Sequence, residues 1–261
     1  MLAVMTKTLS IPDFVQDADE RHSGLAEEYS VLTRLVNPVL AEPRSARFDN
    51  FRHTVLLQCA IGWHHYNAVV LLLANRFVIP SLVLSRTLFE LVVGTLYLIK
   101  NPNLLPDFLD HGKLVFYESA LAANVTEARL APIKEECEKI RPRFLQGKKK
   151  LQWHKSGIGV LAGSVGLMQA YKVFYQDASG ATHADATKTL RYLSRGWVQS
   201  LRAFDDGKQA SPVCYASFMA VANLFLQVNK ALDMGHDDEA KAVLLLTEER
   251  YERMKTLARP N

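Results

Sequence analysis

The sequence predicts an all-α protein, a helical bundle of about eight helices with a central apolar helical hairpin. Apolar residues recur at spacings of three and four along most of the chain, which is the period of an amphipathic helix. Two segments, 54–75 and 80–100, are too apolar for surface helices and are expected to pair at the centre. With 49% apolar and 22% charged residues, the composition is typical of a folded globular protein. We therefore expect residues 1–261 to form a single all-helical domain.

The first helix is predicted from Leu25 to Leu40. Pro38 and Pro43 are expected to end it, because proline removes a backbone donor and disrupts a helix interior. Its apolar face comprises Leu25, Tyr29, Leu32, Leu35 and Val36.

The two central helices follow, the first from about Ala46 to Asn75 and the second from near Pro80 to Asn101. Proline is tolerated in the first turn of a helix, which is why Pro80 marks a start. Residues 54–75 contain no Asp, Glu, Lys or Arg and are long enough to span a bilayer. They also contain polar residues that would be costly in hydrocarbon, namely Gln58, His64, His65 and Asn67. We therefore expect a core helix and no membrane partner.

The middle of the chain is predicted to contain shorter helices. Pro106 opens a helix that continues to about Asn124, and a break is expected near Ala131-Pro132, before a helix at 134–140. The most linker-like segment of the chain is 147–150.

A further helix is predicted from Ile158 to Tyr175. Gly159, Gly163 and Gly166 weaken its helicity but permit close approach of a neighbour, so we expect a tight crossing there.

The C-terminal third is predicted to contain three more helices. Thr182 caps a helix that runs to about Phe204. The next helix covers 211–235, and an amphipathic helix capped by Asp237 or Asp238 covers 237–258. We expect the helices of 211–258 to pack on the rest of the bundle.

The charge is distributed unevenly. The chain carries a formal charge of +4, whereas the segment 139–155 carries seven basic residues and no acid, which leaves −3 for the remainder. This segment is either a phosphate-binding or acid-binding surface or a solvated basic loop. Cys59, Cys137 and Cys214 are widely spaced and odd in number, which favours a reducing cytoplasm over a disulfide framework. No metal-ligand or nucleotide-binding motif is present, and we assign no metal or cofactor.

Arg86 and Glu90 are the main candidate for a polar site. They are the only charged residues between Phe77 and Ile99, and a spacing of four places them on one helical face. Such a pair either ties helices together or lines a polar cavity. His183 is the candidate third member, because it follows a glycine-containing turn and begins a helix, where it could act as a general base. A first-turn histidine can equally be a packing or surface residue.

Two segments resemble a known family. The first is 81–90, which contains Arg86 and Glu90, and the second is 175–183, which contains Tyr175, Ser179 and His183. Together they resemble the bacterial all-helical family of unknown function 5677, over about residues 67–190. The resemblance implies that Arg86, Glu90, Ser179 and His183 converge in one pocket, and Trp153 falls where such domains often have a tryptophan. A more distant similarity is to HEPN domains, which are helical ribonucleases, through the spacing of Arg47 and His53.

These features lead to two main functional hypotheses. The first is a bacterial cytoplasmic effector in stress or phage defence that cleaves RNA without a metal ion. In this hypothesis His183 takes the proton of the 2′-hydroxyl, Arg86 stabilises the charged phosphorane, and Glu90 orients Arg86. The strand would be held by Lys148, Lys149, Lys150 and Trp153. The second is a noncatalytic binding or scaffold protein that recognises a protein partner or a small anionic ligand. Homodimerisation fits either hypothesis, and a metal-dependent hydrolase is a third alternative.

Overall fold

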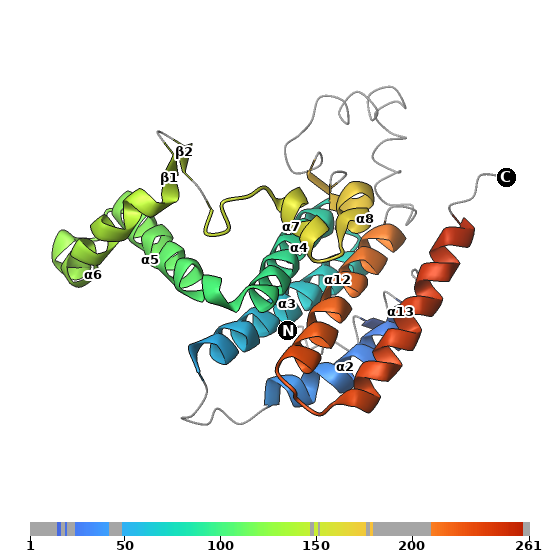
Figure 1. Ribbon diagram of the computed structural model, residues 1–261. Helices are drawn as coiled ribbons and strands as arrows, with labels where there is room; N and C mark the ends of the chain where they lie inside the picture. The colour runs from blue at the N-terminus through green and yellow to red at the C-terminus, as the bar shows by residue number, and fades with distance from the viewer. Residues whose placement is uncertain are drawn as a thin grey trace, which may run out of the picture.

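The protein is described here by a computed structural model that covers residues 15–16, 19, 24–41, 49–146, 149–150, 152–175, 178–179 and 210–257. Helices dominate these residues, and the predicted all-α class is confirmed (Figure 1). Within the described residues, β-structure is limited to two strands of two residues each.

Helix α2, Leu25–Ala41, begins where the Asp19 carboxylate accepts hydrogen bonds from the backbone N–H groups of Gly24 and Ala26, at 3.0 and 2.9 Å. These bonds satisfy donors that have no partner inside the helix. The prediction that Pro38 ends this helix is wrong, because Pro38 lies inside it. Tertiary packing explains the difference, since fully buried residues lie on both sides of the proline and hold the last turn in place.

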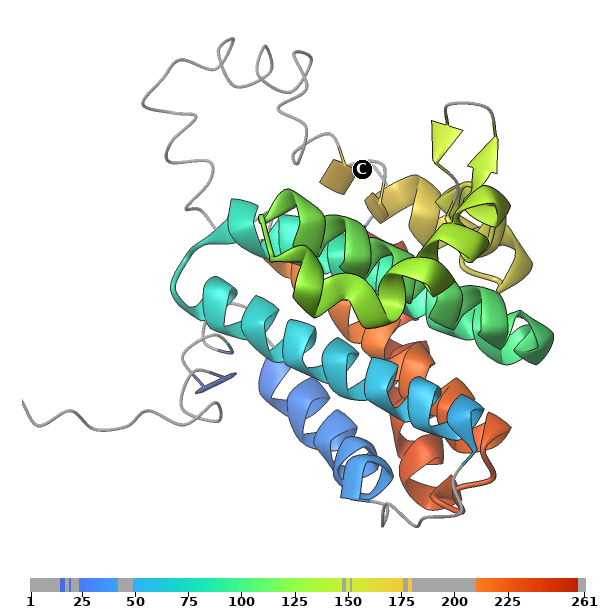
Figure 2. The ribbon, with the colours of Figure 1, turned by 90° about the vertical axis from the view of Figure 1, so that its left-hand side faces the viewer.

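Helices α3, Asn50–Ala74, and α4, Val78–Lys100, form the predicted central hairpin. Both are long and apolar enough to cross a membrane, a property that core helices share, and here they pack against each other and against α12, Ala210–Ala231. Figure 2 shows α3 in front of α12 and beside α2. Gly62 makes the α3–α12 contact close, since a Cβ there would lie 2.9 Å from Leu224 Cδ2. Tyr66, Phe218 and Phe225 are among the largest side chains of this core.

Beyond α4 the chain leaves the bundle in an arm formed by α5, Leu105–Ala122, and α6, Glu127–Ile140 (Figure 1). The short 3-10 helix η1, Pro102–Leu104, precedes the arm, and η2, Arg141–Phe144, follows it. The predicted break near Pro132 is wrong: Pro132 lies inside α6, and the chain turns instead at Asn124, where φ is +57°. A left-handed residue cannot continue a right-handed helix. The lost hydrogen bond and the ring clash of Pro132 can instead be offset by packing, because Leu130 and Cys137 of α6 are buried.

Two residues of the segment predicted as a linker, Lys149 and Lys150, contribute to a small strand pair. Strand β1, Leu145–Gln146, pairs antiparallel with β2, Lys149–Lys150. The described chain then continues to the helices that pack against α4.

The helix predicted over 158–175 is divided into α7, Ile158–Ser164, α8, Met168–Ala170, and the π-helical turn η3, Tyr171–Tyr175. Gly166 accounts for the break, because its φ of +79° is incompatible with a continuous right-handed helix. Gly159 allows a close contact within this segment, since a Cβ there would lie 3.0 Å from the Tyr171 ring. A tight crossing with a neighbouring helix at the glycines stays a prediction.

Helices α12 and α13, Asp237–Leu257, complete the described bundle, and α13 packs against α12 and α2. The bounds of α13 agree with the predicted helix over 237–258, whereas α12 begins as predicted but ends at Ala231, before Gly235. The turn between them is closed by Asn229, whose Oδ1 accepts a hydrogen bond from the backbone N–H of His236 at 3.1 Å. The helix predicted from Thr182 to Phe204 lies outside the described residues.

Candidate functional site

Arg86 and Glu90 form an ion pair that a third residue, Tyr175, joins from another part of the chain. Arg86 Nη2 lies 3.0 Å from Glu90 Oε1, as expected for residues one turn apart. The Tyr175 hydroxyl donates a hydrogen bond to the same carboxylate oxygen at 2.6 Å and accepts one from Arg86 Nη2 at 3.3 Å. The guanidinium also lies over the Tyr175 ring, 5.3 Å from its centroid. These three side chains are called the Arg86 cluster below.

The position of the Arg86 cluster follows from the faces of α4. Ser85 is buried and its hydroxyl accepts a hydrogen bond from Ser217 of α12 at 2.7 Å. Phe89 is buried beside the Tyr175 ring, with the two centroids 5.5 Å apart. Arg86 and Glu90 therefore lie at the edge of the packed face, where η3 reaches α4.

The Arg86 cluster is accessible to solvent. The side chains of Arg86 and Glu90 are 20% and 40% exposed, whereas Tyr175 is 7% exposed. The predicted contact between Arg86 and Glu90 is confirmed, and the pair lies at the rim of the apolar bundle.

The pKa values of Arg86 and Tyr175 are both raised in the cluster. Burial lowers the pKa of Arg86, but the hydrogen bond to Tyr175 and the charge of Glu90 outweigh it, so the net shift is upward. Burial and the hydrogen bond to Glu90 raise the pKa of Tyr175, against the opposing effect of Arg86. Around neutral pH Arg86 is therefore a cation and Tyr175 a neutral phenol.

Of the other predicted site residues, Ser179 has a helical backbone, as does the preceding Ala178, which is fully buried. His183 lies outside the described residues, so its convergence with Arg86 stays a prediction. The sequence places Tyr175 at the start of the family segment 175–183 but does not indicate a role for it in the site. Its position at the end of the aromatic-rich run Tyr171–Tyr175 was the available signal.

Comparison with known proteins adds one finding. The model of the family of unknown function DUF5677 matches residues 57–197, which is more than half of the chain. The chain belongs to this family. No curated protein and no solved structure gives a significant match. The matched span of this DUF5677 member contains Arg86, Glu90 and Tyr175, and the HEPN resemblance gains no support from the comparisons.

In this DUF5677 member, Trp153 is a core residue. It is 8% exposed and packs in a hydrophobic cluster with Leu98 and Phe144. Its ring meets Phe108 edge-on at a centroid distance of 5.2 Å and lies 6.0 Å from the ring of Tyr97. Stacking on a nucleic acid base would require Trp153 to leave this cluster.

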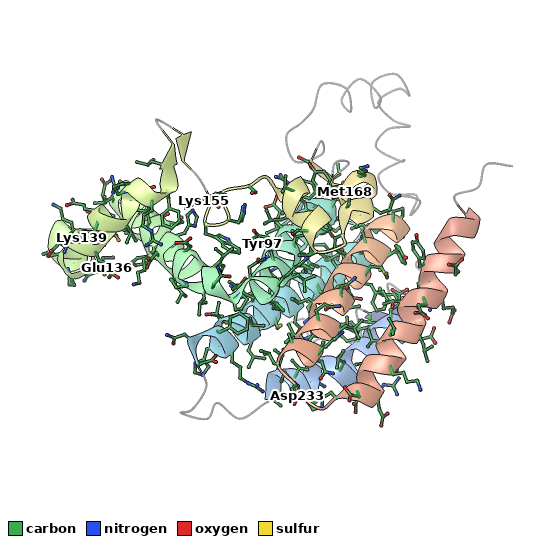
Figure 3. All side chains as sticks on the ribbon, viewed as in Figure 1. Tyr97, Glu136, Lys139, Lys155, Met168 and Asp233 are labelled. Carbon is green, nitrogen blue, oxygen red and sulfur yellow. The ribbon has the colours of Figure 1, made fainter. Side chains whose placement is uncertain are left out.

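The basic segment 139–155 is partly neutralised by acids of the arm. Lys139 pairs with Glu135 at 2.6 Å, and Arg143 pairs with Asp110 at 2.7 Å and also with Asp107. Figure 3 shows Lys139 and Glu136 on α6, at the end of the arm remote from α12. Lys148 lies outside the described residues, and Lys149 and Lys150 are placed only as the backbone of β2.

A second charged cluster, missed by the sequence analysis, joins α2 to α13. The Arg250 side chain is only 8% exposed, and its Nε lies 2.9 Å from Glu28 Oε1. Its Nη2 donates a hydrogen bond to Glu27 at 2.6 Å, and its Nη1 donates one to Glu249 at 3.4 Å. Burial raises the pKa of Glu28 to about 7, although Arg250 acts in the opposite direction. Gly24 provides space for the guanidinium, because a Cβ there would lie 2.6 Å from Arg250 Nη2.

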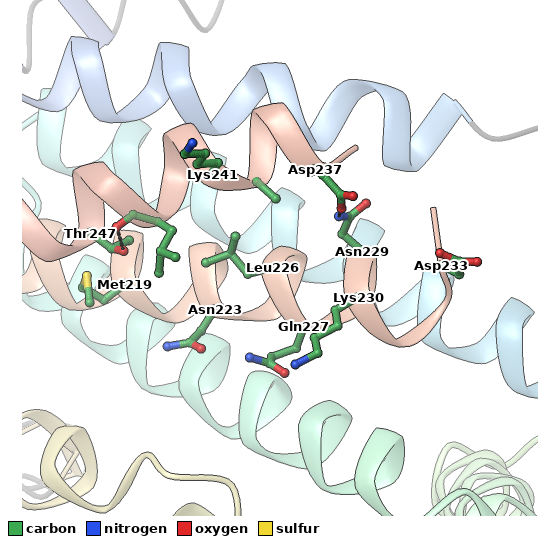
Figure 4. A pocket seen from close by; sticks show the side chains of 12 residues that line it. Met219, Asn223, Leu226, Gln227, Asn229, Lys230, Asp233, Asp237, Lys241 and Thr247 are labelled. Carbon is green, nitrogen blue, oxygen red and sulfur yellow. Dashed lines mark hydrogen bonds between the residues drawn. The ribbon is translucent and has the colours of Figure 1, made fainter. Parts of the chain in front are cut away.

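An open groove of about 520 Å³ lies between α12 and α13, away from the Arg86 cluster (Figure 4). Amide and lysine side chains, among them Asn223, Gln227 and Lys230, line it together with apolar ones such as Leu226. No group of three or more His, Cys, Asp or Glu side chains suited to a metal ion occurs among the residues that the structure describes.

Proposed function

We propose that the Arg86 cluster binds a phosphate group of RNA and that the chain cleaves RNA without a metal ion. The supporting observation is that Arg86 is held by Glu90 and Tyr175 and still reaches solvent. A guanidinium that is already oriented stabilises a developing phosphorane without reorganising during the reaction. Glu90 and Tyr175 are positioning residues in this proposal.

His183 is the proposed general base. It follows Tyr175 by eight residues, so covalent geometry limits the two to a separation of at most about 29 Å. In the proposed reaction His183 takes the proton of the 2′-hydroxyl, whose oxygen attacks phosphorus and forms a 2′,3′-cyclic phosphate. The bond from phosphorus to the 5′-oxygen breaks, and that oxygen takes a proton from water. The hydroxide that remains takes the proton from His183, which restores the base.

The test is cleavage of a fluorescently labelled oligoribonucleotide by the full chain in the presence of EDTA. Arg86→Ala and His183→Ala should each lower the rate by about 100-fold or more, in line with the loss of a phosphorane-stabilising donor or a general base. Arg129→Ala removes an exposed arginine of α6 and is the matched control. Full cleavage by folded Arg86→Ala or His183→Ala protein, or no cleavage by the unaltered chain, would refute the proposal.

In a bacterial cell, a ribonuclease of this kind would act as a stress or phage-defence effector. Expression of the unaltered chain should then arrest growth, and Arg86→Ala should relieve the arrest at equal protein level.

The second candidate is a noncatalytic protein that binds a protein partner or a small anionic ligand. The specific observation in its favour is that Arg86 and Glu90 compensate each other's charge and connect α4 to η3 through Tyr175. In that case Arg86→Ala lowers the melting temperature without changing any RNA cleavage. Inorganic phosphate, titrated by calorimetry, is the probe for a small anion.

A further inference from the structure

The groove between α12 and α13, called the α12–α13 groove below, has hydrogen-bonding side chains along one wall. Asn223, Gln227 and Lys230 line it and follow one another on α12 at four and three residues, so they lie within about 60° of the helix surface. Figure 4 shows the three side chains extending to the same side of α12. The groove is also lined by apolar side chains, among them Leu226 and Leu244, which is 47% exposed. A ligand in the groove therefore meets polar and apolar contacts side by side.

The fold does not use this row of polar side chains. Among the residues that the structure describes, the amides of Asn223 and Gln227 have no hydrogen-bond partner, and Lys230 has no ion-pair partner. Asn229 lines one end of the same groove and differs, because both ends of its carboxamide are hydrogen-bonded in the turn between α12 and α13. Asn229 is therefore structural, whereas Asn223 and Gln227 each keep donors and an acceptor for a ligand.

The other charges around the α12–α13 groove decide which class of ligand fits. Lys230 and Lys241 lie on opposite walls and extend away from each other in Figure 4, so they do not converge on one small anion. Asp233 and Asp237 line the groove as well and would repel the phosphates of a nucleic acid. A docked helix has its backbone groups bonded internally and leaves the two carboxamides without partners. An extended peptide, by contrast, presents unpaired N–H and C=O groups along each edge.

We propose that the α12–α13 groove binds an extended peptide segment of a partner protein, with the peptide backbone paired to Asn223 and Gln227. Four residues of α12 advance by about 6.0 Å along the helix axis. On one edge of an extended chain the backbone groups of every second residue recur at about 6.6–6.8 Å. The two carboxamides therefore match peptide residues two positions apart, and each can donate to a carbonyl and accept from an N–H. The proposal does not depend on RNA cleavage, because the groove lies away from the Arg86 cluster.

The same geometry predicts which peptide sequence fits best. Side chains of an extended chain alternate between its two faces, so every second side chain faces the apolar part of the groove, at Leu226 and Leu244. Lys230 lies about 4.5 Å further along α12 than Gln227 and carries a positive charge at the end of the row. We therefore expect alternating apolar residues, followed by an acidic residue beside Lys230.

Fluorescence polarisation with the full chain tests the proposal. The probe is a fluorescein-labelled hexapeptide of alternating leucine and serine with glutamate in the last position, and such a short contact should give a dissociation constant on the order of 0.1–1 mM. Gln227→Met and Asn223→Leu keep the approximate size of each side chain but remove its amide, and each should weaken binding by about 10-fold. Gln169→Met, at an exposed position of α8, is the matched control and should bind normally. Circular dichroism confirms that the variants are folded.

N-methylation of the peptide gives an independent readout. One peptide carries N-methyl groups on its first, third and fifth residues and another on its second, fourth and sixth, so each lacks the N–H groups of one edge only. One of the two should bind as tightly as the unmethylated peptide, and the other about 10-fold more weakly. Equal binding of the two would show that side chains alone hold the peptide, and it overturns the proposal. Unchanged binding to folded Gln227→Met protein overturns it as well, as does no binding to the unaltered chain up to about 5 mM, well above the expected constant.

Discussion

The buried Glu28 carboxylate should make the stability of the protein depend on pH in a way that one substitution removes. Its pKa in the folded protein is about 7, against 4.5 for an ordinary glutamate. Between these two values the folded chain binds more protons than the unfolded chain, so the free energy of unfolding falls as pH rises. The two pKa values differ by about 2.5, which corresponds to a total loss of about 3 kcal/mol that is complete above pH 7.

Glu28→Gln removes the titrating group but leaves Arg250 with Glu27 and Glu249 as partners. The free energy of unfolding, measured by urea denaturation between pH 5 and 8, should therefore fall less in Glu28→Gln than in the unaltered chain. Linkage over that interval gives a difference of about 2.5 kcal/mol, with the variant relatively more stable at high pH.

Glu27→Gln is the matched control for this experiment. Glu27 precedes Glu28, contacts the same guanidinium at 2.6 Å and is 60% exposed. Because the Glu27 side chain is exposed, its removal should cost about 0–1 kcal/mol. The charge of Glu27 contributes to the raised pKa of Glu28, so the fall in stability with pH should persist and become only slightly smaller. Parallel pH profiles for Glu28→Gln and the unaltered chain would refute the reasoning, since they would show that Arg250 keeps Glu28 ionised in the folded protein.

Three further predictions concern single side chains, each measured by urea denaturation. Trp153→Ala should lower the free energy of unfolding by about 3–5 kcal/mol, as for a buried aromatic, and a loss below about 1 kcal/mol would contradict its place in the core. Tyr175→Phe should lower it by about 1 kcal/mol, because the hydrogen bond goes to a partly exposed carboxylate, whereas Tyr171→Phe should have little effect. Gly166→Ala should lower the free energy of unfolding by about 1–2 kcal/mol, because φ of Gly166 is +79°. Gly112→Ala, at an exposed position of helix α5, should raise it by about 0.5–1 kcal/mol. Equal effects of the two substitutions would contradict the assigned backbone conformations.

The helices of the chain are largely determined by local sequence, because helical hydrogen bonds join residues only four apart. The spacing of apolar residues was sufficient to predict the central hairpin and the two C-terminal helices. Local signals failed at the two prolines, Pro38 and Pro132, which lie inside helices. Packing of residues distant in sequence offsets the lost hydrogen bond there, and this stabilisation is not visible in a local window.

Charged residues in the core were partly visible in the sequence. Glu28 falls three residues after Leu25 and four before Leu32, on the apolar face of its helix. Arg250 falls four residues after the buried Leu246 in the same way. Each position therefore indicates a buried charge, but that the two meet depends on the packing of α2 against α13, which brings together residues more than 220 positions apart.

The sequence by itself determined that Arg86 and Glu90 contact each other, because residues four apart on one helix lie on the same face. Only the tertiary structure decided that Tyr175 joins them, 85 residues away from Glu90, and that Trp153 packs into the core. It also decided that the pair lies at a solvent-accessible rim. The physical reason is that helix formation is governed by local hydrogen bonds, whereas the contacts and exposure of a side chain depend on which helices pack together.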